Sequence, residues 1–230
     1  MLILALETST ELGSCALWHD GELTERCCPA GRSHSETLLP LVGELLASAG
    51  VGVRQLDAIA FGVGPGAFTG LRVACGVAQG LAVAADIPLF PVTSLEAMAE
   101  AAAAERVLAL LDARMGEVYA GTYQRSADGY LLQGEIRLSA PADVLLPEGT
   151  GGLVACGNAP AAYPLLLQRL SAAGMALLPD VWPQAAALLR LALPRVRRGE
   201  GIDAALAAPL YIRDKVAKTV AERLREGGRA

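Results

Sequence analysis

The sequence predicts an α/β fold made of two related halves. Short apolar runs, typical of buried strands, alternate along the 230 residues with longer segments that carry apolar side chains at helical spacing. Apolar residues make up 53% of the chain and aromatic residues only 4%, so alanine and leucine fill most core positions and favour closely packed helices. A pattern near the N-terminus also returns after residue 105, which divides the sequence into two.

Apolar runs bounded by turn residues predict the strands. The first three runs form a plausible antiparallel meander. Pro88 and Pro91 lie in the fifth run, and proline cannot donate to a strand ladder, so this run is expected at a sheet edge or as an irregular strand. In chain order the expected strands are 2–6, 14–18, 23–28, 56–61, 87–92, 106–112, 118–123, 130–138, 153–156 and 208–213.

Stripes of apolar residues predict the helices. Pro40 conflicts with a first helix that begins at Ser33, so this helix either begins nearer Thr37 or kinks at the proline. Two pairs have the spacing of a capping box, Ser33 with Glu36 and Thr93 with Glu96. The expected helices are 34–49, 69–85, 94–104, 142–146, 161–173, 183–198 and a basic tail helix at 214–226.

The pattern of the first strands returns in the second half of the chain. Residues 2–28 read as strand, loop, strand, turn and strand, and residues 107–138 repeat this order. The first strand of each copy ends in an acid, Glu7 or Asp112. Such a repeat indicates two related subdomains that face each other. The expected subdomains are 1–105 and a smaller 106–230, with the tail helix packing back on the first.

Residues 61–85 lead an apolar strand through several glycines into a helix. Free N–H groups at a helix start attract anions, so this corner resembles a phosphate-binding loop. The spacing departs from both common patterns. Leu71 and Arg72 follow Gly70 where a P-loop needs lysine and Ser/Thr, and Thr69 stands at the third glycine position of the dinucleotide fingerprint. A tight strand-to-helix connection without a ligand is therefore favoured.

Gly76 and Gly80 lie one turn apart inside the helix that follows this corner. A glycine in a helix interior costs about 1 kcal/mol relative to alanine. Two on one face suggest that something packs very close there. One interpretation is another helix or strand of the same chain, and the other is a second subunit.

Composition limits the class of protein. The net charge of −5 argues against a stand-alone nucleic-acid binder. Five cysteines without a CxxC pair are expected to be reduced thiols. The apolar start of the chain is too short for a signal peptide, and no run approaches the roughly 18 apolar residues of a membrane helix. We therefore expect a soluble, cytoplasmic protein that does not contact a membrane.

Several stretches carry a family resemblance. They are LALETST, GRSHSETLLP, GVGPGAFTGLRVACGVAQGLA, LLDARMGEVYAG and APLYIRDKVAK. In this order they resemble the TsaB family, also called the glycoprotease-like YeaZ family, over essentially the whole chain up to about Lys218. The resemblance implies an ASKHA (actin/Hsp70/sugar-kinase-like) fold of two subdomains, each a mixed sheet with helices. This agrees with the internal repeat.

The resemblance also implies a function. A TsaB-like chain is a non-catalytic scaffold that dimerises with a catalytic TsaD-type subunit and recruits a TsaE-type ATPase. The assembly transfers threonylcarbamoyl from its adenylate to the adenosine beside the anticodon of ANN-reading tRNAs, and the chain meets tRNA only through the complex. Alone, it pairs with itself as a homodimer. The implied contact is a bundle of the helices at 34–49 and 69–85, with Leu38, Leu41, Leu45, Arg72, Cys75, Gly76 and Gln79 as interface residues.

The residues argue independently against catalysis. The catalytic relative has a metal-binding HxxxH motif on its first helix, whereas here His34 is followed by Leu38 at the second position. The other histidine, His19, lies in a turn. We expect no metal site, no cofactor and no catalytic residue. The serines lack a G-x-S-x-G setting, so a hydrolase reaction has no support.

Glu7 and Asp112 end equivalent strands, where ASKHA kinases place the carboxylates that hold Mg²⁺ and phosphate. A nucleotide between them would lie near Ser9, Thr10, Gly157 and Asn158. Glutamate is one methylene longer than the commoner aspartate, and no dense glycine motif marks an adenosine pocket. We therefore interpret these residues as a vestigial nucleotide cleft. The alternative is a small ASKHA nucleotide-binding ATPase or kinase.

Overall fold

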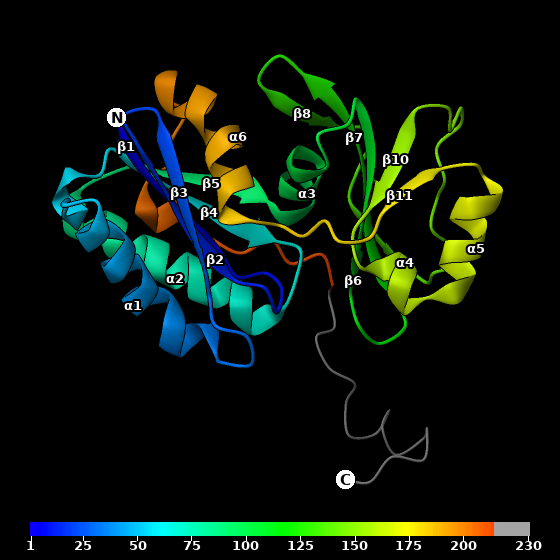
Figure 1. Cartoon of the computed structure of the whole chain (residues 1–230), viewed down its shortest axis with the longest axis horizontal. Coiled ribbons are helices and arrows are strands. Elements are labelled where there is room, and N and C mark those ends of the chain that lie inside the picture. The colour runs from blue at the N-terminus through cyan, green and yellow to red at the C-terminus, as the bar shows by residue number, and fades with distance from the viewer. Residues whose placement is uncertain (214–230) are drawn as a thin grey trace, which may run out of the picture.

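The computed structural model describes residues 1–213, which form two lobes side by side (Figure 1). The tail helix predicted at 214–226 lies outside the described residues. Each lobe contains one mixed sheet. The strand order is β3-β2-β1-β4-β5 in the first sheet and β11-β10-β6-β7-β8 in the second, where β9 also pairs with β7.

The first sheet contains the predicted meander. Its strands β1, β2 and β3 pair antiparallel, whereas β4 and β5 continue from β1 in parallel. β5 lies at the sheet edge, as the prolines of the predicted run indicate, although only Pro91 falls inside the strand. The bounds are β1 (Leu2–Glu7), β2 (Ser14–His19), β3 (Glu22–Cys27), β4 (Ala58–Gly64) and β5 (Leu89–Thr93).

The second sheet repeats the first in order and direction. β6, β7 and β8 pair antiparallel, and β10 and β11 continue from β6 in parallel. The internal repeat is therefore confirmed. Its bounds are β6 (Arg106–Asp112), β7 (Val118–Ser126), β8 (Gly129–Leu132), β9 (Arg137–Ser139), β10 (Leu153–Cys156) and β11 (Ala176–Leu178).

Some predicted elements are wrong. The single strand at 130–138 is two strands, because residues 133–136 separate β8 from β9 while both pair with β7. Residues 208–213 form no strand, and residues 142–146 form no helix. The helix at 161–173 is divided into α4 (Ala159–Ala162) and α5 (Pro164–Ala172), since Pro164 begins a new helix.

The outer faces of the two sheets are covered by different helices. α1 (His34–Ser48) and α2 (Phe68–Ala85) cover the first sheet, and α4 and α5 cover part of the second (Figure 1). α1 begins at His34 with Pro40 inside it, so the later start near Thr37 is wrong. The short 3₁₀ helices are η1 (Val53–Gln55) and η2 (Ala204–Leu206).

The two predicted capping boxes behave differently. Ser33 is the N-cap of α1, but its Oγ lies 2.7 Å from the Ser35 Oγ, and in the described chain it caps no helix N–H. The Thr93 Oγ1 accepts a hydrogen bond from the Glu96 N–H at 3.2 Å, which caps α3 (Ser94–Ala102). For the second capping box, the predicted cap by the Thr93 side chain is therefore confirmed.

The inner helices are exchanged between the lobes. α3 ends the first repeat but packs on β6, whereas α6 (Ala185–Arg197) ends the second repeat but packs on β1 and β2. The expected boundary at 104–106 separates the two sheets, yet α6 and η2 return to the first lobe. One core that includes Ile3, Leu95, Leu111 and Leu188 joins both lobes and fixes their orientation.

Candidate functional site

Glu7 is enclosed at the carboxyl end of β1. Its side chain is 0% exposed, and its Oε1 accepts a hydrogen bond from the Ser9 N–H. Among the described residues, its Oε2 and the Ser9 Oγ have no hydrogen-bond partner. Burial raises the pKa of Glu7 above its ordinary value, although the hydrogen bond from the Ser9 N–H partly opposes the shift. Glu7 therefore lies inside the protein rather than on the wall of an open site.

The glycine corner packs on the turn that follows β1. A Cβ at Gly62 would collide with the Glu7 carboxyl group, and a Cβ at Gly70 would collide with the Thr8 carbonyl oxygen. The Thr8 hydroxyl in turn donates to the Gly70 carbonyl at 2.7 Å. These glycines permit a close approach of two chain segments. These contacts explain why the corner has glycines without invoking a ligand. They agree with a tight strand-to-helix connection, the interpretation that the sequence favours.

Asp112 makes its contacts within its own lobe. The Tyr163 hydroxyl donates to Asp112 Oδ1 at 2.6 Å, and the Arg114 N–H donates to the same oxygen at 2.8 Å. The Arg114 guanidinium lies 3.4 Å from Oδ2. Burial and this hydrogen bond to Asp112 raise the pKa of Tyr163 to about 12. The carboxylate is thus satisfied by protein groups on both oxygens.

A small cavity of about 80 Å³ lies between the lobes. Ser9, Thr10, Asp112 and Asn158 line it, as the sequence predicts, whereas Glu7 does not. Typical ligand pockets measure roughly 300–1,000 Å³, so the space in this conformation is too small for a nucleotide.

Gly157, the sixth predicted cleft residue, does not line this cavity either. Its N–H donates to the Leu178 carbonyl, and a Cβ there would collide with the Leu110 carbonyl. Asn158 has a structural contact as well, since its Oδ1 accepts from the Asp112 N–H at 2.9 Å. Gly157 and Asn158 therefore make contacts within the protein that connect neighbouring segments of the second lobe.

His34 begins α1 and fastens it to the turn after β1. Its Nε2 lies 2.8 Å from the Thr10 carbonyl oxygen. Leu38, which stands where the catalytic relative's motif has its second histidine, is 0% exposed in the core. Residues 1–213 contain no group of three His, Cys, Asp or Glu side chains that could hold a metal ion.

The expected interface residues fall into two groups. Leu38, Leu45 and Cys75 are buried against the first sheet, and Leu41 is partly buried against the same cluster. Their apolar stripe packs on the sheet of their own chain, because an amphipathic helix turns this face to the nearest core. Gln79 holds other parts of the chain, since its Nε2 donates to the Ala204 and Ala207 carbonyls. Only Arg72 and Gly76 are exposed.

The outward sides of α1 and α2 nevertheless form a surface, which we call the α1–α2 face, where apolar and small residues lie beside the exposed charges of Glu36, Glu44 and Arg72. Its exposed apolar and small residues are Leu39 and Gly43 on α1, and Gly76, Gly80 and Val83 on α2. Leu39 is 51% exposed and Val83 is 73% exposed. Arg72 is the one charged residue in α2. α2 also has the length and composition of a membrane span, a weak indication that buried core helices share.

Gly76 and Gly80 lie on the exposed side of α2. A Cβ at either position would meet no described atom within 4 Å. The described residues therefore do not supply the close packing that the glycine spacing suggests, and the subunit contact stays a prediction. Leu39, Gly43 and Val83 are missed by sequence reasoning. The spacing of Gly76 and Gly80 was the sequence signal that could have identified which side of α2 faces outward.

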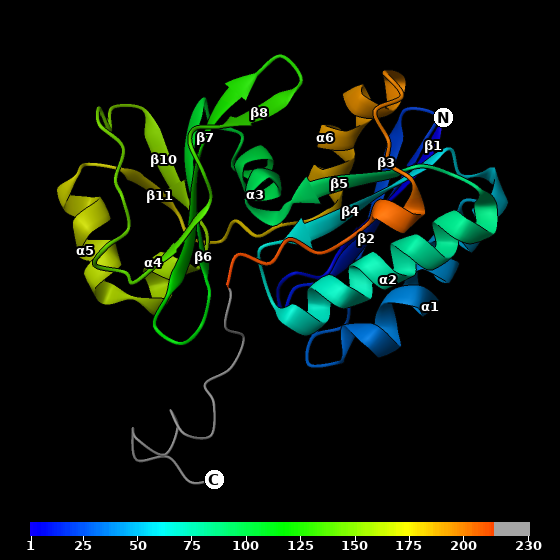
Figure 2. The ribbon, with the colours of Figure 1, turned by 180° about the vertical axis from the view of Figure 1, so that it is seen from behind.

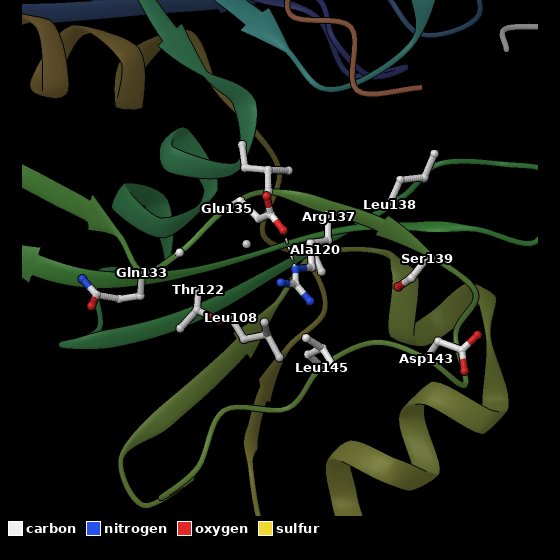
Figure 3. Close-up of a pocket in the computed structure, with 13 residues that line it drawn as sticks. Leu108, Ala120, Thr122, Gln133, Glu135, Arg137, Leu138, Ser139, Asp143 and Leu145 are labelled. Atoms are coloured by element: carbon white, nitrogen blue, oxygen red, sulfur yellow. Dashed lines mark ion pairs between the residues drawn. The ribbon is translucent and has the colours of Figure 1, made fainter. Parts of the chain in front are cut away.

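A larger cavity of about 680 Å³ lies on the outer face of the second sheet. It opens beside β7, the counterpart of β2, on which α1 packs in the first lobe. Among the described residues, the second lobe has no helix between β8 and β10 to match α1. None of the predicted site residues lines this cavity. An ion pair of Arg137 and Glu135, with a nitrogen–oxygen distance of 3.0 Å, crosses its middle (Figure 3).

Comparison with protein families gives one match over most of the chain. The family described as "TsaD: tRNA N6-adenosine threonylcarbamoyltransferase" matches residues 29–220. Among curated proteins, "tRNA threonylcarbamoyladenosine biosynthesis protein TsaB" of Haemophilus influenzae is 38% identical, covering 94% of this chain and 95% of that protein. The protein of the same name from Escherichia coli is 36% identical, covering 94% and 96%.

A solved structure shows the same fold. "YeaZ from Pseudomonas aeruginosa" superposes with a TM-score of 0.83 at 41% sequence identity, over 91% of this chain and 99% of that one. Both lobes are therefore shared with that protein.

Proposed function

The chain belongs to the TsaB family of tRNA threonylcarbamoyladenosine biosynthesis proteins, and we propose that it acts there as a non-catalytic scaffold. It dimerises with the catalytic TsaD-type subunit and recruits the TsaE-type ATPase in the cytoplasm. The assembly then transfers threonylcarbamoyl to the adenosine beside the anticodon of ANN-reading tRNAs. In the absence of its partner, the chain forms a homodimer.

The observation that carries this proposal is the α1–α2 face. Gly76 and Gly80 weaken a long helix without packing on any described part of the chain. Small residues allow another helix to approach closely, and the neighbouring Leu39 and Val83 supply apolar side chains to bury. We take this surface as the docking site for a helix pair of the partner. The proposed interface therefore consists of these exposed residues and no longer includes Leu38, Leu45 and Cys75, which are buried.

The geometry of the cleft supports the non-catalytic role that we propose for this chain. Glu7 is enclosed, Asp112 is held by Tyr163 and Arg114, and the cavity between the lobes is about 80 Å³. We infer that the cleft is a vestige of a nucleotide site and that catalysis belongs to the TsaD-type subunit. The family model with the TsaD description matches residues 29–220, and we take this match to reflect a shared fold rather than a shared reaction.

Co-elution of the full-length chain with the TsaD-type subunit of the same organism tests the docking site. Val83→Glu combined with Gly76→Leu places a charge and a bulky side chain on the α1–α2 face. We expect this variant to elute alone, with a free energy of unfolding no lower than that of the wild type. Leu131→Glu is the matched control, since Leu131 is 59% exposed on the second lobe. Co-elution of the double variant at wild-type level would refute the site.

A further inference from the structure

Residues 207–213, which we call the strap, cross from the first lobe to the second. They leave η2, pass between α2 and the end of β4, and reach the loop between β6 and β7 (Figure 2). In the first lobe, the Gln79 Nε2 donates to the Ala207 carbonyl at 3.1 Å. The Leu210 N–H donates to the Val63 carbonyl at 2.8 Å. The strap is therefore fastened to both α2 and β4.

Tyr211 is the point where the strap meets the proposed docking surface. The Arg72 Nε–H donates to the Tyr211 hydroxyl at 3.0 Å. The Arg72 guanidinium also lies 3.8 Å from the centre of the Phe68 ring, which is 5.5 Å from the centre of the Tyr211 ring. Tyr211 is 47% exposed, so a docked protein could reach this cluster. Arg72 thus contacts the strap, and it also lies on the exposed side of α2.

Arg213 fastens the other end of the strap to the second lobe. Its guanidinium pairs with Glu117 and lies 3.4 Å from both the Arg114 carbonyl oxygen and the Met115 sulfur. The Arg213 side chain is only 15% exposed, so water and salt screen this pair less than a fully exposed one.

The loop that Arg213 contacts has an uncommon backbone. Arg114 and Met115 have φ values of 60° and 57°, a region that few residues other than glycine adopt. Surrounding contacts must hold such a conformation in place. The strap supplies several contacts to this loop through Arg213.

We propose that the strap and the docking partner compete for Arg72, so that docking on α2 releases Tyr211 and loosens the β6–β7 loop of the opposite lobe. This inference rests on the proposed function, because it takes the α1–α2 face as the docking surface. Arg72 is the one charged residue in α2, so an acidic group of the partner is its natural new contact. Because the coupling is reciprocal, the factor by which docking favours release of the strap equals the factor by which release of the strap favours docking.

Affinity for the TsaD-type subunit, measured by titration calorimetry with the full-length chain, tests the competition. Tyr211→Phe removes the hydroxyl that Arg72 contacts and keeps the ring, whereas Glu117→Gln weakens the anchor of Arg213 in the other lobe. Each variant should bind roughly fivefold more tightly or better. The double variant should gain little beyond the better single variant, because both changes release the same strap. Unchanged or weaker binding by either single variant would overturn the competition.

Amide hydrogen exchange in the free chain tests the coupling without a partner. Arg72→Ala should speed exchange at residues 113–117, which are more than 40 residues away in sequence, while Arg26→Ala on β3 serves as the matched control with no effect. Unchanged exchange in Arg72→Ala would overturn the coupling even where the partner binds as proposed. A wild-type chain that fails to bind the partner would overturn the proposed function and the competition, and the exchange result would still decide whether the strap links the lobes.

Discussion

Glu7 and Asp112 end corresponding strands of the two lobes, yet their side chains lie on opposite faces of those sheets. Glu7 is opposite Ser14, whose hydroxyl accepts a hydrogen bond from α6 on the inner face. Asp112 is opposite Val118, which belongs to the outer core of the second lobe. The sequence alignment of the repeats pairs the two acids, but β6 is one residue longer than β1, and side chains alternate between faces along a strand.

The divergence of the two acids predicts that they do not hold Mg²⁺ and nucleotide together. We expect titration of the isolated chain with ATP to show the same negligible heat with and without Mg²⁺. Asp112→Asn should leave this result unchanged. Micromolar, Mg²⁺-dependent ATP binding would contradict the vestigial cleft and favour the alternative of a small ATPase or kinase.

Glu7 predicts a pH dependence of stability. Burial raises its pKa in the folded state. Its favourable contribution is therefore fully present below the pKa of the unfolded chain and is lost as pH rises through the folded-state pKa. Glu7→Gln should be more stable than the wild type at neutral pH and should lose less stability as pH rises. Urea unfolding from acidic to neutral pH measures this, with Glu22→Gln on the exposed β3 as the control. Parallel pH profiles for Glu7→Gln and the wild type would contradict the assignment.

Two glycines of α2 should respond in opposite ways to alanine. Gly76→Ala meets open space and improves helix propensity, so we expect it to raise the free energy of unfolding by about 0.5–1 kcal/mol. Gly70→Ala forces a Cβ against the Thr8 carbonyl and should lower it by about 1–3 kcal/mol. Chemical denaturation measures both. A destabilised Gly76→Ala would mean that the outward side of α2 is already covered in the isolated chain.

The two predicted capping boxes supply a matched pair of substitutions. Thr93→Ala removes the acceptor of the Glu96 N–H and should cost about 1 kcal/mol of stability. Ser33→Ala should cost less than about 0.5 kcal/mol, since its hydroxyl faces Ser35 rather than the helix. Thermal or urea unfolding compares them, and equal losses would show that the Ser33 hydroxyl caps α1 in solution.

Much of the fold follows from local sequence patterns. Apolar runs and turns locate most strands, the repeat predicts the duplicated sheet, and the two subdomains of mixed sheet and helices implied by the resemblance are confirmed. The exchange of α3 and α6 between lobes could not be predicted, because an apolar stripe shows that a helix packs without showing which sheet it packs on.

The site was harder to predict for the same reason. Leu38 and Leu45 form the stronger apolar stripe of α1 and are buried in the core, so the surface that we propose for the partner has only weaker sequence signals, such as Gly76 and Leu39. The contact between Arg72 and Tyr211 joins residues 139 positions apart, a separation that no local pattern reports.

The scaffold role is tested most directly by threonylcarbamoyl transfer to tRNA with reconstituted TsaC-, TsaD- and TsaE-type enzymes. We predict strict dependence on this chain, with Val83→Glu combined with Gly76→Leu failing to restore transfer and Leu131→Glu restoring it fully. Transfer at the same rate without the chain would contradict the account.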